Sequence, residues 1–151
     1  MYNRRKINEL LKIEFNKAKR YGVDFCVAIM DIDFFKSVND EHGHSCGDNV
    51  LKQFSELVKN SIRDTDIFGR WGGEEFILIF THSNLENAFL KCEHLRETIE
   101  NRKFDNINIT CSIGLVAYNK SYGSVDDLLE KSDQALYKAK ESGRNKVMVF
   151  K

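Results

Sequence analysis

The sequence predicts an α/β (α+β) fold, with a mixed central sheet that contains a β-hairpin and has helices packed on its faces. Helical and strand-like hydrophobic patterns alternate along the chain. The run Phe25–Met30 is apolar throughout, as in a strand that is covered on both faces. Two adjacent glycines, Gly72 and Gly73, separate two further strand-like runs, which is typical of a hairpin turn. Helices layered on a mixed sheet are the simplest architecture that accommodates these three features.

The first half of the chain is expected to form three helices around the apolar strand. Charged residues with apolar residues at helical spacing predict a helix over residues 3–20. After the strand, residues 34–41 have the pattern of a short helix, and the segment 42–47 is expected to be a loop because it is rich in glycine. The helical pattern resumes at Asp48 and continues to about Arg63.

The second half is expected to alternate strands and helices. The expected strands cover residues 66–70, 75–80, 107–118 and 146–150, and a helix is expected over residues 84–101. Ser124 followed by Asp127 resembles a capping box that opens one more helix, which Gly143 ends. The hairpin around the two glycines argues against a purely parallel, doubly wound sheet.

Length and composition indicate one globular domain. The chain has 151 residues, of which 42% are hydrophobic and 30% are charged, and this argues against disorder. Basic and acidic residues both number 23, so a broadly basic surface for nucleic acid is not indicated. No apolar run reaches the roughly 20 residues of a membrane span, and the N-terminus has no apolar signal region. We therefore expect a cytoplasmic protein, or the cytoplasmic part of a membrane-anchored one.

The four cysteines, Cys26, Cys46, Cys92 and Cys111, have no CxxC spacing, so a zinc ribbon or a redox motif is not expected. Three of them lie in apolar patterns and are expected to be buried free thiols. Cys46 lies in the glycine-rich segment, where exposure is expected.

Two acidic pairs are candidates for metal binding. Asp31 and Asp33 end the apolar strand, where alternation points both to one face and where burial is costly without a partner. Glu74 and Glu75 follow the two glycines and point to opposite faces of a strand. Mg²⁺ binds carboxylates together with substrate phosphates, and carboxylates from two chain segments suit its phosphoryl chemistry. Solvated acids at a strand end and at the rim of a hairpin are the alternative.

Two further groups of polar residues suit a purine nucleotide. The first group is Asn39, His44 and Asp48, and the second is Lys36, Lys140 and Arg144. A carboxylate can accept from both N–H groups on the Watson–Crick edge of guanine, and an amide can complete the recognition; a helix cap is the alternative for Asp48. Cationic side chains can clamp a triphosphate, although a basic helix end also complements the helix dipole.

Several segments match one known family in their order along the chain. These segments are Asp31–Lys36, Asn39–His44, Gly47–Asp48, Arg70–Phe76, Ser112–Gly114, Asp133–Lys140 and Gly143–Asn145. On these motifs the chain resembles a GGDEF-family diguanylate cyclase over nearly its whole length, in the common GGEEF spelling. The resemblance implies a fold like the palm of nucleotidyl cyclases and polymerases. It also implies a reaction, the condensation of two GTP into cyclic di-GMP and two pyrophosphates.

The resemblance also implies roles for individual residues. Asp31, Glu74 and the carbonyl of Ile32 would hold Mg²⁺ (or Mn²⁺), and Glu75 would be a second metal ligand or the base for the ribose 3′-hydroxyl. Glu74 and Glu75 both stay candidates for that base. The nucleotide would be held by Asn39 and Asp48 at the guanine, by His44 beside it, by Lys36, Lys140 and Arg144 at the phosphates, and by Gly72 and Gly73 through close backbone approach.

Assembly and regulation follow from the same resemblance. Each domain is expected to hold one GTP, so that two domains face each other in a homodimer. Arg63 and Asp66 stand at the spacing of the family's inhibitory RxxD site, which implies cyclic di-GMP as inhibitor; a salt-bridged turn is the alternative, and Arg96 is a candidate second arginine. Tyr2–Arg5 resembles the end of the family's opening motif. Residues 1–151 are therefore expected to be one catalytic domain, cut from a longer protein with an upstream sensory or receiver domain.

Three other functions compete with this one. A domain of this kind can bind GTP or cyclic di-GMP without turnover, but the intact Gly-Gly-Glu-Glu sequence argues against it. A cyclase for a mixed purine dinucleotide is opposed by Asp48, because an acid favours guanine. A purely structural domain, with all these acids solvated, would fail to bind Mg²⁺–GTP.

Overall fold

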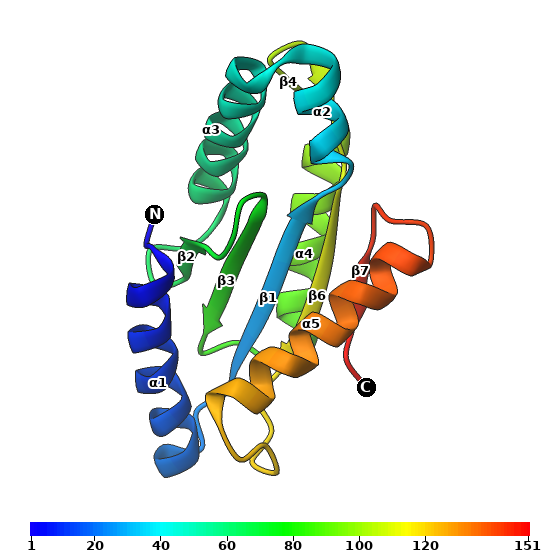
Figure 1. Cartoon of the computed structure of the whole chain (residues 1–151). Coiled ribbons are helices and arrows are strands. Elements are labelled where there is room, and N and C mark those ends of the chain that lie inside the picture. The colour runs from blue at the N-terminus through cyan, green and yellow to red at the C-terminus, as the bar shows by residue number, and fades with distance from the viewer.

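The computed structural model describes all 151 residues and has five helices around a five-stranded mixed sheet (Figure 1). The helices are α1 (Arg4–Tyr21), α2 (Phe35–His42), α3 (His44–Ser61), α4 (Leu85–Glu100) and α5 (Val125–Glu141). The strands of the main sheet are β1 (Phe25–Ile32), β2 (Ile67–Arg70), β3 (Glu75–Thr81), β6 (Cys111–Ala117) and β7 (Val147–Val149). Their order is β2-β3-β1-β6-β7, and only the β6–β7 pair is parallel. The expected mixed sheet, with its hairpin, is confirmed.

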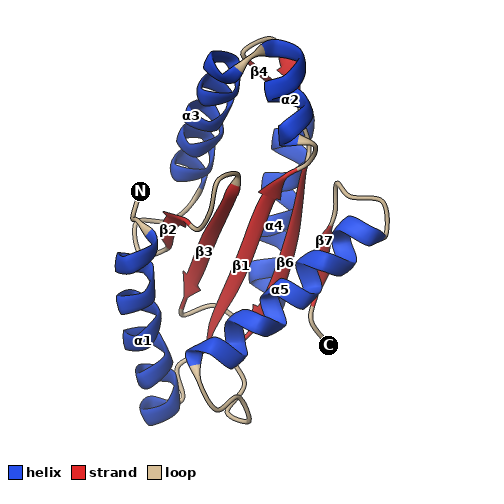
Figure 2. Ribbon diagram, viewed as in Figure 1, coloured by secondary structure: helices blue, strands red, loops and turns tan.

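The sheet is covered by helices on both faces, as Figure 2 shows. One hydrophobic cluster joins the sheet to α1 and α5, and a larger one joins its other face to α2, α3 and α4. The central strand β1 separates the two clusters, because successive side chains of a strand point to opposite faces. Phe25, Val27 and Ile29 enter the first cluster, and Cys26, Ala28 and Met30 enter the second. Complete burial of a large apolar side chain contributes roughly 1.5–3 kcal/mol, so β1 is a firm support for the residues at its end.

The expected helix starts are confirmed where a capping side chain marks them. The Asn3 side chain accepts from the backbone N–H of Lys6 at the start of α1. The Ser124 side chain does the same for Asp127 at the start of α5. The helix α5 ends at Glu141, and Gly143 follows with a φ of 115°, a conformation that costs glycine little.

The expected loop over residues 42–47 is wrong. Only Gly43, with a φ of 87°, interrupts the chain between α2 and α3, and α3 already begins at His44. Asp48 therefore lies in the second turn of a helix and is not its cap. The sequence misled because Gly47, which is typical of loops, is here a buried helical residue that lets α2 approach α3 closely.

The single strand expected over residues 107–118 is also wrong. A small separate hairpin, β4 (Lys103–Phe104) with β5 (Ile107–Asn108), precedes β6. Its turn residues Asp105 and Asn106 have φ values of 50° and 63°, as a two-residue turn with both central residues left-handed requires. Strands of two residues are too short to show the alternation of apolar and polar residues by which a strand is recognised in a sequence.

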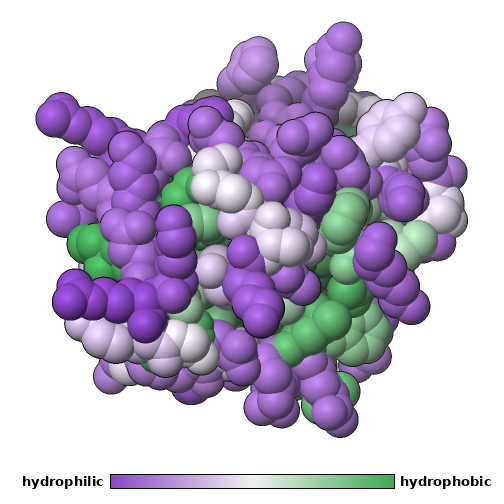
Figure 3. Space-filling view, turned by 90° about the horizontal axis from the view of Figure 1, so that it is seen from below, coloured by the Kyte–Doolittle hydropathy of each residue, from purple (hydrophilic) through white to green (hydrophobic).

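The thiols and the surface fit a folded domain with a closed core. Cys26, Cys92 and Cys111 are free and buried, as expected, whereas Cys46 is half-buried in α3 rather than exposed in a loop. Figure 3 shows one end of the molecule, where hydrophilic side chains predominate and leave only limited apolar areas between them. No helix of the chain combines the length and the hydropathy that a membrane crossing requires.

The N-terminal residues extend the sheet at its β2 edge. Tyr2 pairs with Gly69 in parallel orientation, its N–H donates to the Phe68 carbonyl (3.0 Å), and its carbonyl accepts from Arg70 (2.9 Å). The first residues are thereby attached to the strand that leads into the Gly-Gly turn.

Candidate active site

Asp31 occupies the end of β1 and is the most buried of the candidate metal ligands. Its Cα pairs with Glu75 of β3 on one side and with Ser112 of β6 on the other. Only 8% of its side chain is exposed, and its carboxylate forms an ion pair with Lys140 of α5. Burial raises the pKa of Asp31, while the bond to Lys140 acts in the opposite direction. A buried carboxylate needs a cation, and in this structure Lys140 supplies it.

A small cleft of about 160 Å³ gathers most of the predicted phosphate and metal ligands. It is lined by Asp31, Ile32, Asp33, Phe34, Phe35, Lys36, Glu74, Lys140 and Arg144. Six of these were predicted as site residues, and they come from β1, α2, the β2–β3 turn and the end of α5. Residues that are up to about a hundred positions apart in the sequence therefore meet at the end of β1, which is the upper end of that strand in Figure 1.

The turn between β2 and β3 brings Glu74 to Asp31. The Glu74 carbonyl accepts from the N–H of Ile32 (3.3 Å), which ties the turn to the end of β1. Within the turn, the N–H groups of Trp71 and Gly72 both donate to the Glu75 carbonyl, at 2.8 and 3.1 Å. This tight turn is the hairpin that the adjacent glycines predicted.

Two arginines that were not predicted as site residues hold the outward carbonyls of this turn. Arg70 Nε donates to the carbonyls of Gly72 (3.1 Å) and Gly73 (3.2 Å). Arg4 Nη1 donates to the Trp71 carbonyl (3.1 Å), and the Arg4 guanidinium lies 4.1 Å from the centre of the Trp71 ring. The only signal in the sequence was that both arginines lie inside recognised motifs. A contact to a backbone carbonyl requires no particular partner residue, so no sequence pattern marks it.

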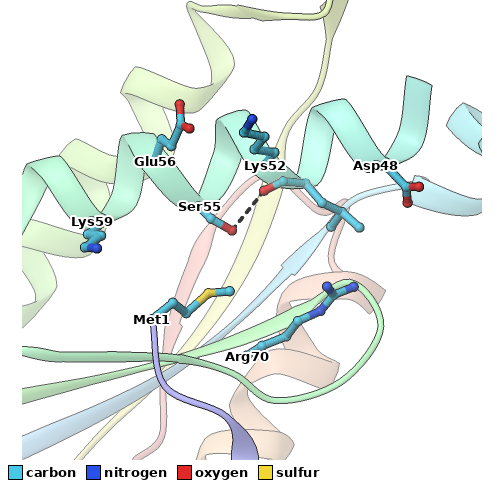
Figure 4. A pocket seen from close by; sticks show the side chains of 8 residues that line it. Met1, Asp48, Lys52, Ser55, Glu56, Lys59 and Arg70 are labelled. Carbon is cyan, nitrogen blue, oxygen red and sulfur yellow. Dashed lines mark hydrogen bonds between the residues drawn. The ribbon is translucent and has the colours of Figure 1, made fainter. Parts of the chain in front are cut away.

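The residues predicted to read guanine, Asn39 and Asp48, and His44, predicted beside it, lie on α2 and α3, outside the cleft. Asn39 is half-buried on α2, and His44 and Asp48 are exposed on α3. Asp48 lines a separate pocket of about 430 Å³ together with Arg70. Figure 4 shows that Asp48 and Arg70 enter this pocket from α3 and from β2 respectively, at the same end of it. Asp48 therefore lies in the same pocket as Arg70, the residue that bonds to the Gly-Gly turn.

Comparison with known proteins identifies the family. The model of the family described as "Diguanylate cyclase, GGDEF domain" matches residues 1–146. The chain belongs to the GGDEF family. Diguanylate cyclase A of Treponema denticola is 37% identical over 83% of this chain and 35% of its own length, and the probable diguanylate cyclase DgcT of Escherichia coli is 38% identical over 99% and 34%. The GGDEF domain described here thus spans about a third of the length of these relatives.

Solved structures confirm the palm-like fold. The active GGEEF domain of a diguanylate cyclase from Vibrio cholerae superposes with a TM-score of 0.94 at 36% identity, covering 99% of this chain and 97% of that one. The coiled coil and GGDEF domain of DgcB from Caulobacter crescentus, solved in complex with cyclic di-GMP, has a TM-score of 0.93 at 28% identity, covering 99% and 81%.

The donor set of the GGDEF cleft fits a divalent cation that arrives with its substrate. Asp31 and Glu74 offer hard carboxylate oxygens from two chain segments, and the ion pair with Lys140 shows that a positive charge is accommodated beside Asp31. No three acidic, histidine or cysteine side chains come together as a metal-binding group. The two carboxylates are compatible with a divalent ion such as Mg²⁺, which commonly takes one or two carboxylates and completes its coordination with phosphates and water.

Glu75 faces a different environment from Glu74. It does not line the cleft, and its Cα stands opposite Asp31 across the β1–β3 pair. Partial burial raises the pKa of Glu75, and the charges of Asp31 and Asp133 raise it further against the effect of Lys140. Asp133 was not predicted as a site residue, although it precedes Lys140 by seven positions and so shares its face of α5.

The predicted inhibitory residues lie at the opposite end of the sheet. The Asp66 side chain is completely buried and accepts from the N–H (3.0 Å) and Nη2 (2.9 Å) of Arg63. Arg63 Nη2 also donates to the carbonyl of Thr81, which ends β3, whereas Glu75 begins that strand. In this structure the pair forms a salt-bridged turn, with the Arg63 side chain half exposed.

Arg96, the candidate second inhibitory arginine, forms its hydrogen bonds and ion pairs elsewhere than with Arg63 and Asp66. Its guanidinium bonds to Glu93 (3.1 Å) and to the Asn145 side chain (3.0 Å), which adjoins the active-site cleft. The cation of α4 that comes near Arg63 is Lys91, whose Nζ donates to the Ser61 carbonyl (3.0 Å). Which residue of α4 lies near Arg63 depends on how that helix packs, and the sequence does not reveal this packing.

Proposed function

We propose that this GGDEF domain is a diguanylate cyclase that condenses two GTP into cyclic di-GMP and two pyrophosphates. One observation carries the proposal: three acidic and three cationic residues from separate parts of the chain line a single cleft. The names of the relatives and the cyclic di-GMP bound to the Caulobacter crescentus neighbour support the same reaction.

The cleft is built to hold a triphosphate. Lys36, Lys140 and Arg144 provide three positive charges against the phosphates of the nucleotide and the departing pyrophosphate. Because Lys140 already pairs with Asp31, a phosphate competes with that carboxylate for the ammonium group. Asp31, Glu74 and the Ile32 carbonyl are the groups that would hold Mg²⁺ (or Mn²⁺), which when bound lowers the cost of deprotonating the attacking 3′-hydroxyl. We assign the acceptance of that proton to Glu75, because burial raises its pKa and so makes it the better base of the two glutamates.

The guanine is read by the residues of α2 and α3. Asp48 accepts from the two N–H groups of the Watson–Crick edge, the Asn39 amide completes the set, and His44, exposed at the start of α3, flanks the base. Adenine lacks the exocyclic donor that Asp48 requires, so GTP is preferred to ATP.

Gly47→Ala is expected to weaken GTP binding by about 3–10-fold, the equivalent of one lost hydrogen bond. A Cβ at residue 47 would stand 1.9 Å from Asn39 Oδ1 and 3.0 Å from its Cγ, so the Asn39 amide must turn away. Stability should not fall with it, because alanine exceeds glycine in helix propensity by roughly 1 kcal/mol. Calorimetry with 3′-deoxy-GTP measures the loss. In an Asn39→Ala background the second substitution should add nothing, and an additive loss would contradict the explanation.

We propose a homodimer as the active species. One cleft holds one GTP, and each 3′-hydroxyl must reach the α-phosphate of the other nucleotide, so two domains face each other. An upstream sensory or receiver domain, in a longer protein, would then control how often they meet.

The function is tested by incubating purified domain with GTP and Mg²⁺ after bound cyclic di-GMP has been stripped, and by separating the products chromatographically. We expect cyclic di-GMP as product, with specific activity rising with protein concentration, and no mixed dinucleotide when ATP is added. Tight Mg²⁺–GTP binding without product at any concentration would favour a binding module instead. Absence of GTP binding would remove the enzymatic proposal altogether.

Product inhibition through Arg63 and Asp66 is proposed as well, and Arg63→Lys is the variant that tests it. Alanine would leave the buried Asp66 carboxylate without its partner and destabilise the domain, whereas lysine keeps the charge and loses only the planar fork. We expect the affinity for cyclic di-GMP to fall at least about tenfold, with the initial rate of synthesis unchanged. Calorimetry and progress curves measure the two effects. Unchanged affinity would refute this site.

A further inference from the structure

Asp33 is a buried residue of the cleft lining, and its carboxylate is occupied by hydrogen bonds within the protein. The residue follows β1, two positions after Asp31, and is 6% exposed. Its Oδ1 accepts from Ser112 Oγ (2.7 Å), and its Oδ2 accepts from Thr110 Oγ1 (2.7 Å) and from the backbone N–H of Asn145 (3.0 Å). Three donors from two elements therefore satisfy the charge, and Asp33 needs no metal ion to do so.

The N–H that Asp33 binds belongs to a strained turn. Arg144 and Asn145 have φ values of 63° and 48°, two consecutive residues other than glycine in the left-handed region. A left-handed conformation is unfavourable for residues other than glycine and persists only when its surroundings hold it. The Asn145 side chain is held in addition by Arg96 Nη1 (3.0 Å) and by Glu100 of α4. The turn is therefore fixed from β1 on one side and from α4 on the other.

The same carboxylate also fixes the other wall of the cleft. Phe34 comes directly after Asp33, has a φ of 56°, and exposes 64% of its surface. The Arg144 guanidinium lies 4.6 Å from the centre of the Phe34 ring. Asp33 thus adjoins this cation–π pair on both sides, through the peptide bond to Phe34 and through the hydrogen bond to Asn145, which follows Arg144.

We propose that Asp33 is a positioning residue that holds Arg144 in place for the triphosphate. It does so by accepting a hydrogen bond from the Asn145 N–H, which fixes the Arg144–Asn145 turn. The proposal rests on the proposed function, in which Arg144 contacts the phosphates. It separates the two acids of the Asp-Ile-Asp motif: Asp31 faces the ligand, and Asp33 supports the residue that binds it.

The test compares Asp33→Ala with Asp33→Asn, using calorimetry with 3′-deoxy-GTP and Mg²⁺, a nucleotide that cannot condense. In the Asn variant, Oδ1 can still accept from Asn145 and Thr110, while Nδ2 donates to the Ser112 hydroxyl. We expect Asp33→Ala to weaken binding about tenfold or more, and Asp33→Asn to stay within about threefold of the wild type. Equal, large losses in both variants would show that the charge of Asp33 acts on the ligand, and would overturn the proposal.

A double-mutant cycle separates positioning from general destabilisation. If Asp33 acts through Arg144, then Asp33→Ala should add little to the loss caused by Arg144→Ala, whereas additive losses would contradict the proposal. Ser132→Ala is the matched control, because it removes another buried hydrogen bond of α5, from Ser132 Oγ to the Gly114 carbonyl, without touching the turn. It should leave nucleotide affinity unchanged.

Amide exchange at Asn145 provides a readout without nucleotide. Its N–H should be protected in the wild type and in Asp33→Asn, and should exchange much faster in Asp33→Ala. Equal protection in all three would refute the anchoring. If the wild type failed to bind 3′-deoxy-GTP, the proposed function would fall, while the exchange rates would still decide whether Asp33 holds the turn.

Discussion

Glu74→Ala is expected to abolish cyclic di-GMP synthesis, with a loss of at least about 10²–10³-fold, and to leave the fold intact. The loss follows because Asp31 and Glu74 are the two carboxylates of the cleft that would hold the metal, whereas Asp33 already accepts from three donors. A catalytic metal contributes several kcal/mol, at about 1.4 kcal/mol per factor of ten. The fold should survive because Glu74 is half exposed and its structural contact is made by its backbone carbonyl, which alanine retains.

Product formation, Mg²⁺-dependent binding of 3′-deoxy-GTP and thermal unfolding together check this expectation. Glu130→Ala, an exposed glutamate of α5, is the control and should behave as the wild type. Glu75→Ala should also abolish product, but as the base it should keep Mg²⁺-dependent binding, which Glu74→Ala should lose. Near-normal synthesis by either variant would remove its assigned role.

Gly114→Ala is expected to destabilise the domain by about 1–3 kcal/mol or more and to reduce synthesis strongly. A Cβ at this position of β6 would stand 2.3 Å from both the Leu136 nitrogen and the Ser132 carbonyl oxygen, and 2.8 Å from the Leu136 Cα. All three are backbone atoms of α5, so no side chain can move aside and the helix itself must shift. The helix carries Lys140, and its displacement would separate the ammonium group from Asp31.

Denaturant unfolding and initial rates measure these two effects. Gly123→Ala is the matched control, since no atom lies within 4 Å of its added Cβ and its φ is not in the left-handed region. It should be neutral or slightly stabilising, by up to about 1 kcal/mol, through its effect on the unfolded chain. A Gly114→Ala protein of wild-type stability would mean that α5 does not pack on β6 as closely as described.

Sequence patterns predicted the elements that are long and periodic. The apolar run of β1, the amphipathic helices and the Gly-Gly hairpin all formed as expected, because burial on one or two faces imposes those periods. The start of α3 and the hairpin β4–β5 were not predicted. Gly47 serves close helix contact rather than a turn, and Asp105 with Asn106 makes a turn between strands too short to be periodic.

The cleft was predictable in part, for a related reason. Asp31, Glu74 and Arg144 belong to motifs whose carboxylates and cations indicate metal and phosphate binding, and the structure brings these three residues together. Arg4 and Arg70 instead act on backbone carbonyls, which any sequence provides. The different environments of Asp31 and Asp33 depend on which donors of β6 and of the turn after α5 stand nearby, and this is a property of the packed protein alone.

The distribution of thiols makes the native chain suitable for a spectroscopic reporter. Cys26, Cys92 and Cys111 are buried, and burial raises the pKa of each, to about 12 for Cys26, so they remain unreactive thiols. Cys46 is only half-buried and stands two residues before Asp48, but a hydrogen bond with Asp105 raises its pKa. A maleimide fluorophore applied at mildly alkaline pH should therefore label Cys46 selectively, and its emission would follow nucleotide occupancy without any engineered cysteine.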